Sequence, residues 1–140
     1  MDFIRLKEDV FFVRLDRGDK VNETLKNFCI EHEIKCARLH GIGALHKVEL
    51  GYYDYDADLY DRRPFEGEYE LLSMEGNVSL MEEDTFVHLH VSMSNEKFEA
   101  IGGHLFEAEV AVTLECFIEI YDADFVRLKG HKEKFRPISF

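Results

Sequence analysis

The chain has 140 residues, of which 46% are hydrophobic and 13% aromatic, and this composition favours one folded domain over residues 1–140. Its formal net charge of −12 argues against a nucleic-acid-binding protein, because Lys and Arg supply most of the affinity for phosphates. No stretch approaches 18 consecutive apolar residues, and the mixed sequence after Met1 lacks an apolar leader. We therefore expect a cytoplasmic protein that does not bind membranes.

The first predicted elements are a strand over residues 10–15 and an amphipathic helix. Gly18 marks the turn between them, and Asp19 is the expected N-cap residue. Apolar residues then recur at helical spacing for about four turns. The predicted buried stripe comprises Val21, Leu25, Phe28 and Cys29, with His32 at its edge.

The remaining chain is predicted to be rich in strands, over residues 44–54, 69–80, 85–94 and 109–121. The glycines of 41–44 lack the rest of a phosphate-loop or dinucleotide motif and predict a tight turn. We expect an α+β domain, with a largely antiparallel sheet packed against one main helix. Alternation predicts inward faces made of Leu72, Met74, Val78 and Leu80, and of Val110, Val112, Leu114, Cys116, Ile118 and Ile120.

The most informative motif is the strand over residues 85–94. Its apolar positions alternate with polar ones, so His88 and His90 share the polar face, where core packing does not explain them. His104 follows the glycine pair at 102–103, which we expect to form a turn that swings this histidine towards the strand. Three converging imidazoles predict a divalent-metal site, with zinc first and nickel, iron or copper as alternatives. Three protein ligands would leave a fourth position open.

Other polar residues are weaker candidates. His40 and His46 bracket the predicted turn at 41–44 and are interpreted as ordinary loop and strand-edge histidines. A general base or a residue supporting the metal ligands could be supplied by Glu75, Glu107 or Glu115, among which the sequence does not choose. The acidic run at 54–58 lacks the glycine and glutamate of a calcium loop and is interpreted as a surface loop.

Cysteines and basic residues suggest no further site. The three cysteines have apolar neighbours and are predicted to be buried without disulfides. The basic C-terminal residues are predicted to form a solvated segment without an aromatic stacking platform. The cysteines are Cys29, Cys36 and Cys116. The basic residues are Arg127, Lys129, Lys132, Lys134 and Arg136.

Five segments, in order and over nearly the whole chain, resemble the PPC domain, the plant-and-prokaryote-conserved domain. They are Gly41–Ala44, Leu50–Asp54, Glu70–Asn77, Val87–Ser92 and Ile101–Leu105. The resemblance implies an antiparallel sheet with a flanking helix, assembled as a homotrimer. It also implies that His88, His90 and His104 are the metal ligands. Plant members typically lack the histidine after the glycine pair, so the chain resembles the stand-alone prokaryotic type.

The family is often described as DNA-binding, but in plant members an AT-hook contacts DNA, and this sequence has none. A trimer of chains with −12 each would carry roughly −36, which opposes approach to a duplex. Two functions stay open. In the first, the trimer is a metal-containing module for assembly or for binding a small-molecule or protein partner. In the second, it is a metal-dependent enzyme that activates water against a small molecule.

Overall fold

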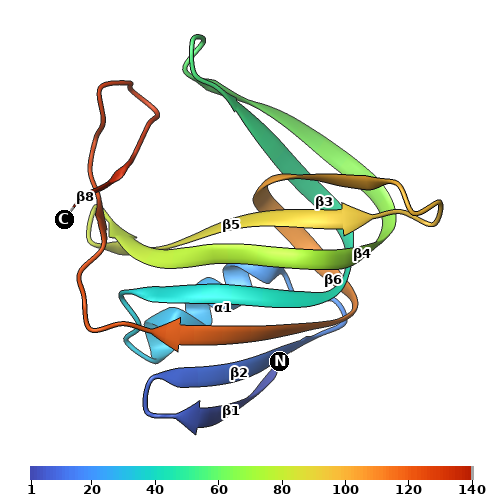
Figure 1. Cartoon of the computed structure of the whole chain (residues 1–140), viewed down its shortest axis with the longest axis horizontal. Coiled ribbons are helices and arrows are strands. Elements are labelled where there is room, and N and C mark those ends of the chain that lie inside the picture. The colour runs from blue at the N-terminus through green and yellow to red at the C-terminus, as the bar shows by residue number, and fades with distance from the viewer. Residues whose placement is uncertain (140) are drawn as a thin grey trace.

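The structure, a computed structural model, describes residues 1–139 as one β-sheet with one α-helix (Figure 1). Strand order is β1-β2-β6-β3-β4-β7-β8, and β5 pairs with both β4 and β6. Every pair is antiparallel except β4 with β7, so the predicted fold class is confirmed. The elements are β1 (Asp2–Lys7), β2 (Val10–Asp16), α1 (Val21–Glu31), β3 (Ala37–Asp54), β4 (Leu59–Met81), β5 (Asp84–Ser94), β6 (Ala100–Ile120), β7 (Val126–Arg127) and β8 (Ile138–Ser139).

The core lies between α1 and the sheet, where the helix packs on β5 and β6. The four residues of the predicted helical stripe are all buried. The helix has 11 residues, about three turns rather than four. Glu33 takes a left-handed conformation (φ 55°), and the Ile34 amide donates to the Cys29 carbonyl, which ends the helix early. No helix among residues 1–139 is long and apolar enough to cross a membrane.

The N-terminus of α1 is capped by a distant strand rather than by Asp19. Lys20 is the N-cap residue and makes no side-chain cap, while the Asp19 carboxylate accepts a hydrogen bond from the Asp16 amide. Glu107 on β6 instead accepts from the Asn22 amide at 2.9 Å and from the Glu23 amide at 3.3 Å. The prediction of Asp19 as the cap was wrong because a cap from another element cannot be found in local sequence.

We expect Glu107→Ala to lower the free energy of unfolding by about 1–2 kcal/mol, because two helix amides lose their acceptor. Urea unfolding followed by circular dichroism measures this. Glu68→Ala is the matched control, since Glu68 is exposed and lies in another strand. Equal stabilities of the two variants would contradict the capping role.

Long strands with bulges account for most differences from the predicted strands. Leu72 is 52% exposed, because the β4–β5 register shifts between Leu71 and Ser73 and turns Leu71 inward. Val112 is 66% exposed. It lies on β6 where the β3–β6 register shifts, opposite the β3 residues between Gly43 and Leu45. Both were predicted to face the core, and alternation fails at a bulge.

The glycines of 41–44 do not form a turn, since they lie within β3. A Cβ on Gly43 would lie 2.3 Å from the Thr113 carbonyl oxygen, so glycine serves close backbone approach there. The predicted strand at 44–54 is therefore part of a longer one. Strand β1 was not predicted, because all its residues are exposed and show no core-facing pattern.

The three cysteines are free and buried, as predicted. Burial raises the pKa of the Cys29 thiol to about 12, so this thiol stays protonated and unreactive at neutral pH. Cysteine therefore contributes to the core and not to a reactive site.

Candidate metal centre

His88 and His90 project from the polar face of β5, as predicted. On the other face of this strand, Leu89 is fully buried and Val91 is 4% exposed. His90 is exposed and His88 is half-buried. Side chains two residues apart on a strand point the same way, so packing of the apolar face fixes both imidazoles on the opposite side.

His104 reaches the same place from β6, where it is the cross-strand partner of His90. The predicted turn at the glycine pair was wrong: Gly102 and Gly103 are extended residues that pair with β5, and neither has a positive φ. A Cβ on Gly102 would lie 2.4 Å from the Val91 carbonyl oxygen. The glycine therefore allows β6 to approach β5 closely, and strand pairing brings His104 to the cluster.

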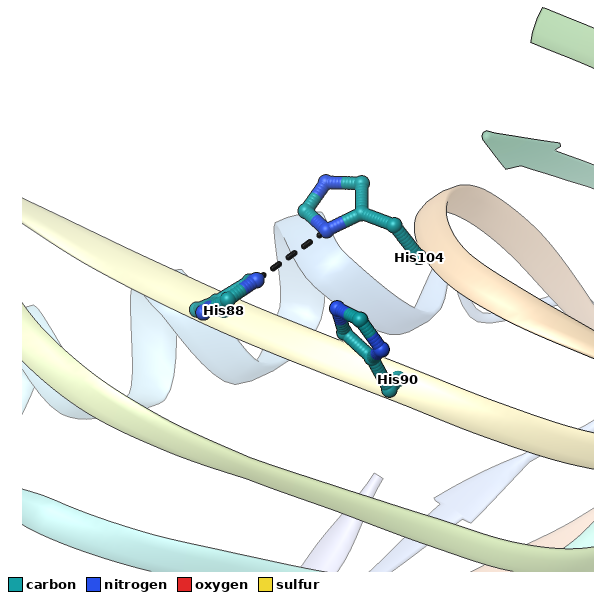
Figure 2. Close-up of side chains that lie close together, drawn as sticks. All are labelled: His88, His90 and His104. Carbon is teal, nitrogen blue, oxygen red and sulfur yellow. Dashed lines mark hydrogen bonds between the residues drawn. The ribbon is translucent and has the colours of Figure 1, made fainter. Parts of the chain in front are cut away.

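The three imidazoles converge, with one ring nitrogen from each within 4.8 Å of the others. Figure 2 shows the rings of His88 and His90, from β5, and of His104, from β6, turned towards a common point. His88 Nε2 and His104 Nδ1 are 3.1 Å apart. Two nitrogens bound to one tetrahedral zinc at 2.0–2.1 Å would be about 3.3 Å apart. The spacing of His88 and His104 therefore already suits a divalent ion, and His90 lies within reach of the same point.

Arg127 determines which nitrogen of His88 carries a proton. Its guanidinium can only donate, and it lies 3.0 Å from His88 Nδ1, which therefore accepts. The proton of the neutral ring is then on Nε2 and is donated to His104 Nδ1. A bound metal would replace this proton between the two rings.

Arg127 does not belong to a solvated segment, contrary to the prediction for the basic residues. It is half-buried and also donates to Ser79 Oγ, to Asn77 Oδ1 and to the Arg136 carbonyl. Aromatic contacts of this segment, which the sequence did not indicate, hold it in place. Lys132 lies 4.9 Å from the ring centroid of Tyr55, and the rings of Phe135 and Tyr53 stack at 6.3 Å. These contacts fold the C-terminal segment against the end of the β3–β4 hairpin, and sequence patterns do not show such distant pairings.

Two of the imidazoles are held neutral. Burial, followed by the charge of Arg127, lowers the pKa of His88 from 6.5 to about 4. Burial also lowers the pKa of His104 to about 4, with smaller effects from His90 and Arg127. Metal binding needs a neutral imidazole, so these two rings are ready for a metal at neutral pH.

These shifts predict how the stability of the metal-free protein depends on pH. As pH falls from about 6.5 towards 4, the unfolded chain takes up protons on His88 and His104 while the folded chain does not. Stability present above pH 6.5 is therefore lost through this window. Melting temperatures at pH 7.5, 6 and 5 should fall more steeply for wild type than for the His88→Gln/His104→Gln double variant. An equal fall of the melting temperature with pH in the two proteins would contradict the lowered pKa values of His88 and His104.

The other candidates lie outside the cluster. His40 stacks on Phe117, with ring centroids 5.1 Å apart, and His46 lies 3.4 Å from Glu109. Glu75 is the cross-strand neighbour of His90, but its carboxylate pairs with Arg38. Glu107 caps the helix, and Glu115 is exposed beside the bulge near Val112. Within residues 1–139, no hydrogen bond or ion pair joins a glutamate of the predicted set to the three imidazoles.

A cavity of about 640 Å³ opens beside His88 and His104. Its walls come from the β3–β4 hairpin, β5, β6 and the C-terminal segment, and include Tyr60, Phe106 and Arg127. This volume is typical of small-molecule sites. None of these three residues was predicted from the sequence to form a binding site. Only Phe106 had a usable signal, since it follows His104 by two residues on the same strand.

Solved structures share this fold. A plant- and prokaryote-conserved (PPC) protein from Pyrococcus horikoshii is 34% identical, with a TM-score of 0.87 over 99% of this chain and 94% of its own. A metal-containing protein from Archaeoglobus fulgidus is 28% identical, with a TM-score of 0.87 over 100% and 99%. A candidate DNA-binding protein from Bacteroides thetaiotaomicron, 24% identical, has a TM-score of 0.94 over 99% and 96%, which supports the fold alone.

No curated protein matches the chain. The sequence model of one family does, over residues 5–122, and this range contains all three histidines of the cluster. The match confirms the resemblance inferred from the five sequence segments. The chain belongs to the Plants and Prokaryotes Conserved (PCC) domain family, for which PPC is another abbreviation.

Proposed function

We propose that this protein is a homotrimeric metal-binding module in which His88, His90 and His104 hold one divalent ion. The observation that carries the proposal is the convergence of three imidazoles, two of them with facing nitrogens 3.1 Å apart. The related Archaeoglobus protein is described as metal-containing, which supports the same reading. Zinc suits three nitrogen ligands best, and nickel, iron and copper also accept imidazole.

The module is proposed to bind a ligand at the metal. Three protein ligands leave one position of a tetrahedral ion free. The cavity of about 640 Å³ borders two of the three imidazoles, His88 and His104. A small molecule or a partner side chain in this cavity could therefore reach the ion directly.

Assembly is proposed to use an exposed apolar patch formed by Ile42, Leu72 and Val112. These side chains are 57%, 52% and 66% exposed and line one shallow depression over β3, β4 and β6. Exposed apolar patches mark contact surfaces between proteins. A second copy of the chain is the proposed occupant, in keeping with the homotrimer that the family resemblance implies.

A metal-dependent enzyme is the second candidate, favoured by the cavity next to an open coordination position. A three-histidine zinc ion can lower the pKa of a water molecule and activate it. A hydrolase also needs a positioned general base. Among the described residues, the glutamates that line the cavity are Glu82 and Glu133, and both are exposed. This absence of a buried carboxylate favours a binding module over an enzyme.

DNA binding is not part of the proposal. The formal charge of −12 per chain opposes contact with phosphates, and the sequence has no AT-hook.

Metal content tests the proposal. Purified protein should be loaded with zinc, dialysed and analysed by inductively coupled plasma mass spectrometry. We expect about one zinc per chain. Less than about 0.1 zinc per chain after loading would overturn the metal site. Hydrolysis of small ester or phosphoester probes that requires both zinc and His88 would favour the enzyme instead.

A further inference from the structure

Among residues 1–139, the half-buried cation Arg127 has no anionic partner. Its hydrogen bonds all go to neutral acceptors: Ser79, Asn77, the Arg136 carbonyl and His88. Among the ion pairs of residues 1–139, none includes Arg127. A buried charge is normally neutralised by a partner, so an anion from outside the chain would stabilise this residue.

Four hydrogen bonds hold the Arg127 guanidinium in place at the wall of the cavity. A donor fixed in this way loses little entropy when a ligand binds. Tyr60 lines the same cavity. The Tyr60 hydroxyl makes no hydrogen bond within residues 1–139. The cavity therefore presents a fixed cation and a free hydroxyl in one lining.

Aromatic rings form the rest of this wall. The Arg127 guanidinium lies 5.2 Å from the ring centroid of Phe86. Tyr60 and Phe106 pack edge to face at 5.1 Å, and Tyr60 is also 5.1 Å from the ring of His104. Such surfaces bind planar apolar groups well. A ligand that fits both parts of the cavity has one anionic end and a flat apolar body.

Charge at the rim does not oppose an anion. Lys134 and Arg136 also line the cavity, and the two glutamates there, Glu82 and Glu133, are exposed to solvent. Exposed carboxylates are well screened, whereas the half-buried Arg127 is not. In a chain with a net charge of −12, this is a local cationic site.

We propose that the cavity binds a small aromatic carboxylate, with its carboxylate on Arg127 and the Tyr60 hydroxyl and its ring against Phe86 and Phe106. The inference deepens the proposed function and rests on it for the position of this ligand beside the metal. The cation and the aromatic wall belong to the chain itself, so anion binding can be measured with or without metal.

The two sites should be coupled through His88. When His88 Nε2 binds a metal, the neutral ring carries its proton on Nδ1, which can no longer accept from Arg127. One N–H of Arg127 then loses its acceptor and becomes available to a carboxylate in the cavity. Metal therefore promotes carboxylate binding, and by reciprocity the carboxylate tightens metal binding.

Isothermal titration calorimetry with benzoate as the probe tests the proposal on metal-free and zinc-loaded protein. Acetate, which lacks the ring, and benzamide, which lacks the charge, are the matched probes. We expect benzoate to bind more tightly than either, and about tenfold more tightly to the zinc-loaded form. Arg127→Gln should weaken benzoate binding at least about tenfold and reduce the coupling to zinc. Arg63→Gln, at an exposed arginine paired with Asp61, should leave the benzoate affinity and its dependence on zinc unchanged.

Tyr60→Phe is the second variant, because it removes one hydroxyl and keeps the ring, in case Arg127→Gln disturbs folding. We expect up to about tenfold weaker benzoate binding with an unchanged melting temperature. Equal affinity for benzoate in wild type and both variants would overturn the carboxylate site, as would no benzoate binding below about 10 mM.

The outcomes separate the two proposals. Zinc binding without Arg127-dependent benzoate binding overturns the carboxylate site alone. Benzoate binding that needs Arg127 in a protein that never binds zinc overturns the metal site and supports the carboxylate site. Failure of both measurements overturns both.

Discussion

Alanine at His88 is expected to weaken zinc binding by more than about 100-fold, since loss of a mere supporting contact to a metal ligand already costs 10–100-fold. The remaining two imidazoles, His90 and His104, would hold the ion at only two positions. Half-buried His88 also supplies the nitrogen nearest to His104, at 3.1 Å. Competition with a chromophoric zinc chelator measures the affinity.

Controls distinguish ligand loss from misfolding. His40→Ala removes a histidine that stacks on Phe117 outside the cluster, and its zinc affinity should match wild type. Single alanine variants at His90 and His104 should resemble His88→Ala. Full zinc retention by a folded His88→Ala/His90→Ala double variant would exclude the proposed site.

The variant Val112→Asp should convert the proposed trimer to monomers. Val112 is the most exposed side chain of the apolar patch, at 66%. In a trimer, each interface would bury this carboxylate without a partner, at a cost of several kcal/mol. We expect the concentration for half-dissociation to rise at least about 100-fold. Sedimentation velocity over a range of protein concentrations measures the change.

The matched control is Ile30→Asp, on the solvent side of α1, where Ile30 is 49% exposed. Its sedimentation should equal that of wild type. An unchanged trimer in both variants would show that the patch is not the contact surface. A monomeric wild type would contradict the proposed assembly itself.

Sequence periodicity predicted the parts of the site that depend on local alternation. The predicted faces of β5 were correct, because Leu89 and Val91 pack in the core and His88 and His90 therefore point to the other side of the strand. His104 was grouped with them for a partly wrong reason, since its position comes from pairing with His90 and not from a turn. Strand register is a non-local property that one sequence does not display.

Bulges and distant contacts account for the rest. Leu72 and Val112 were assigned to the core, because one extra residue in a strand reverses alternation without a sequence signal. Arg127 lies 39 residues from His88 and on a separate segment, so the basic tail was interpreted as solvated. Glu107 lies 85 residues from Asn22, from whose amide it accepts a hydrogen bond, so this helix cap could not be predicted from local sequence either.

The match to the family's sequence model ends before the C-terminal segment begins. The family match covers residues 5–122, which include all three histidines, whereas Arg127 and the rim residues Lys134 and Arg136 lie beyond it. The proposed metal ligands thus lie inside the matched range, whereas the proposed carboxylate site combines Tyr60, Phe86 and Phe106 from this range with Arg127 from beyond it. If the chain binds such a ligand, changes at Arg127 and the residues after it should alter which molecule fits while the histidine cluster stays intact.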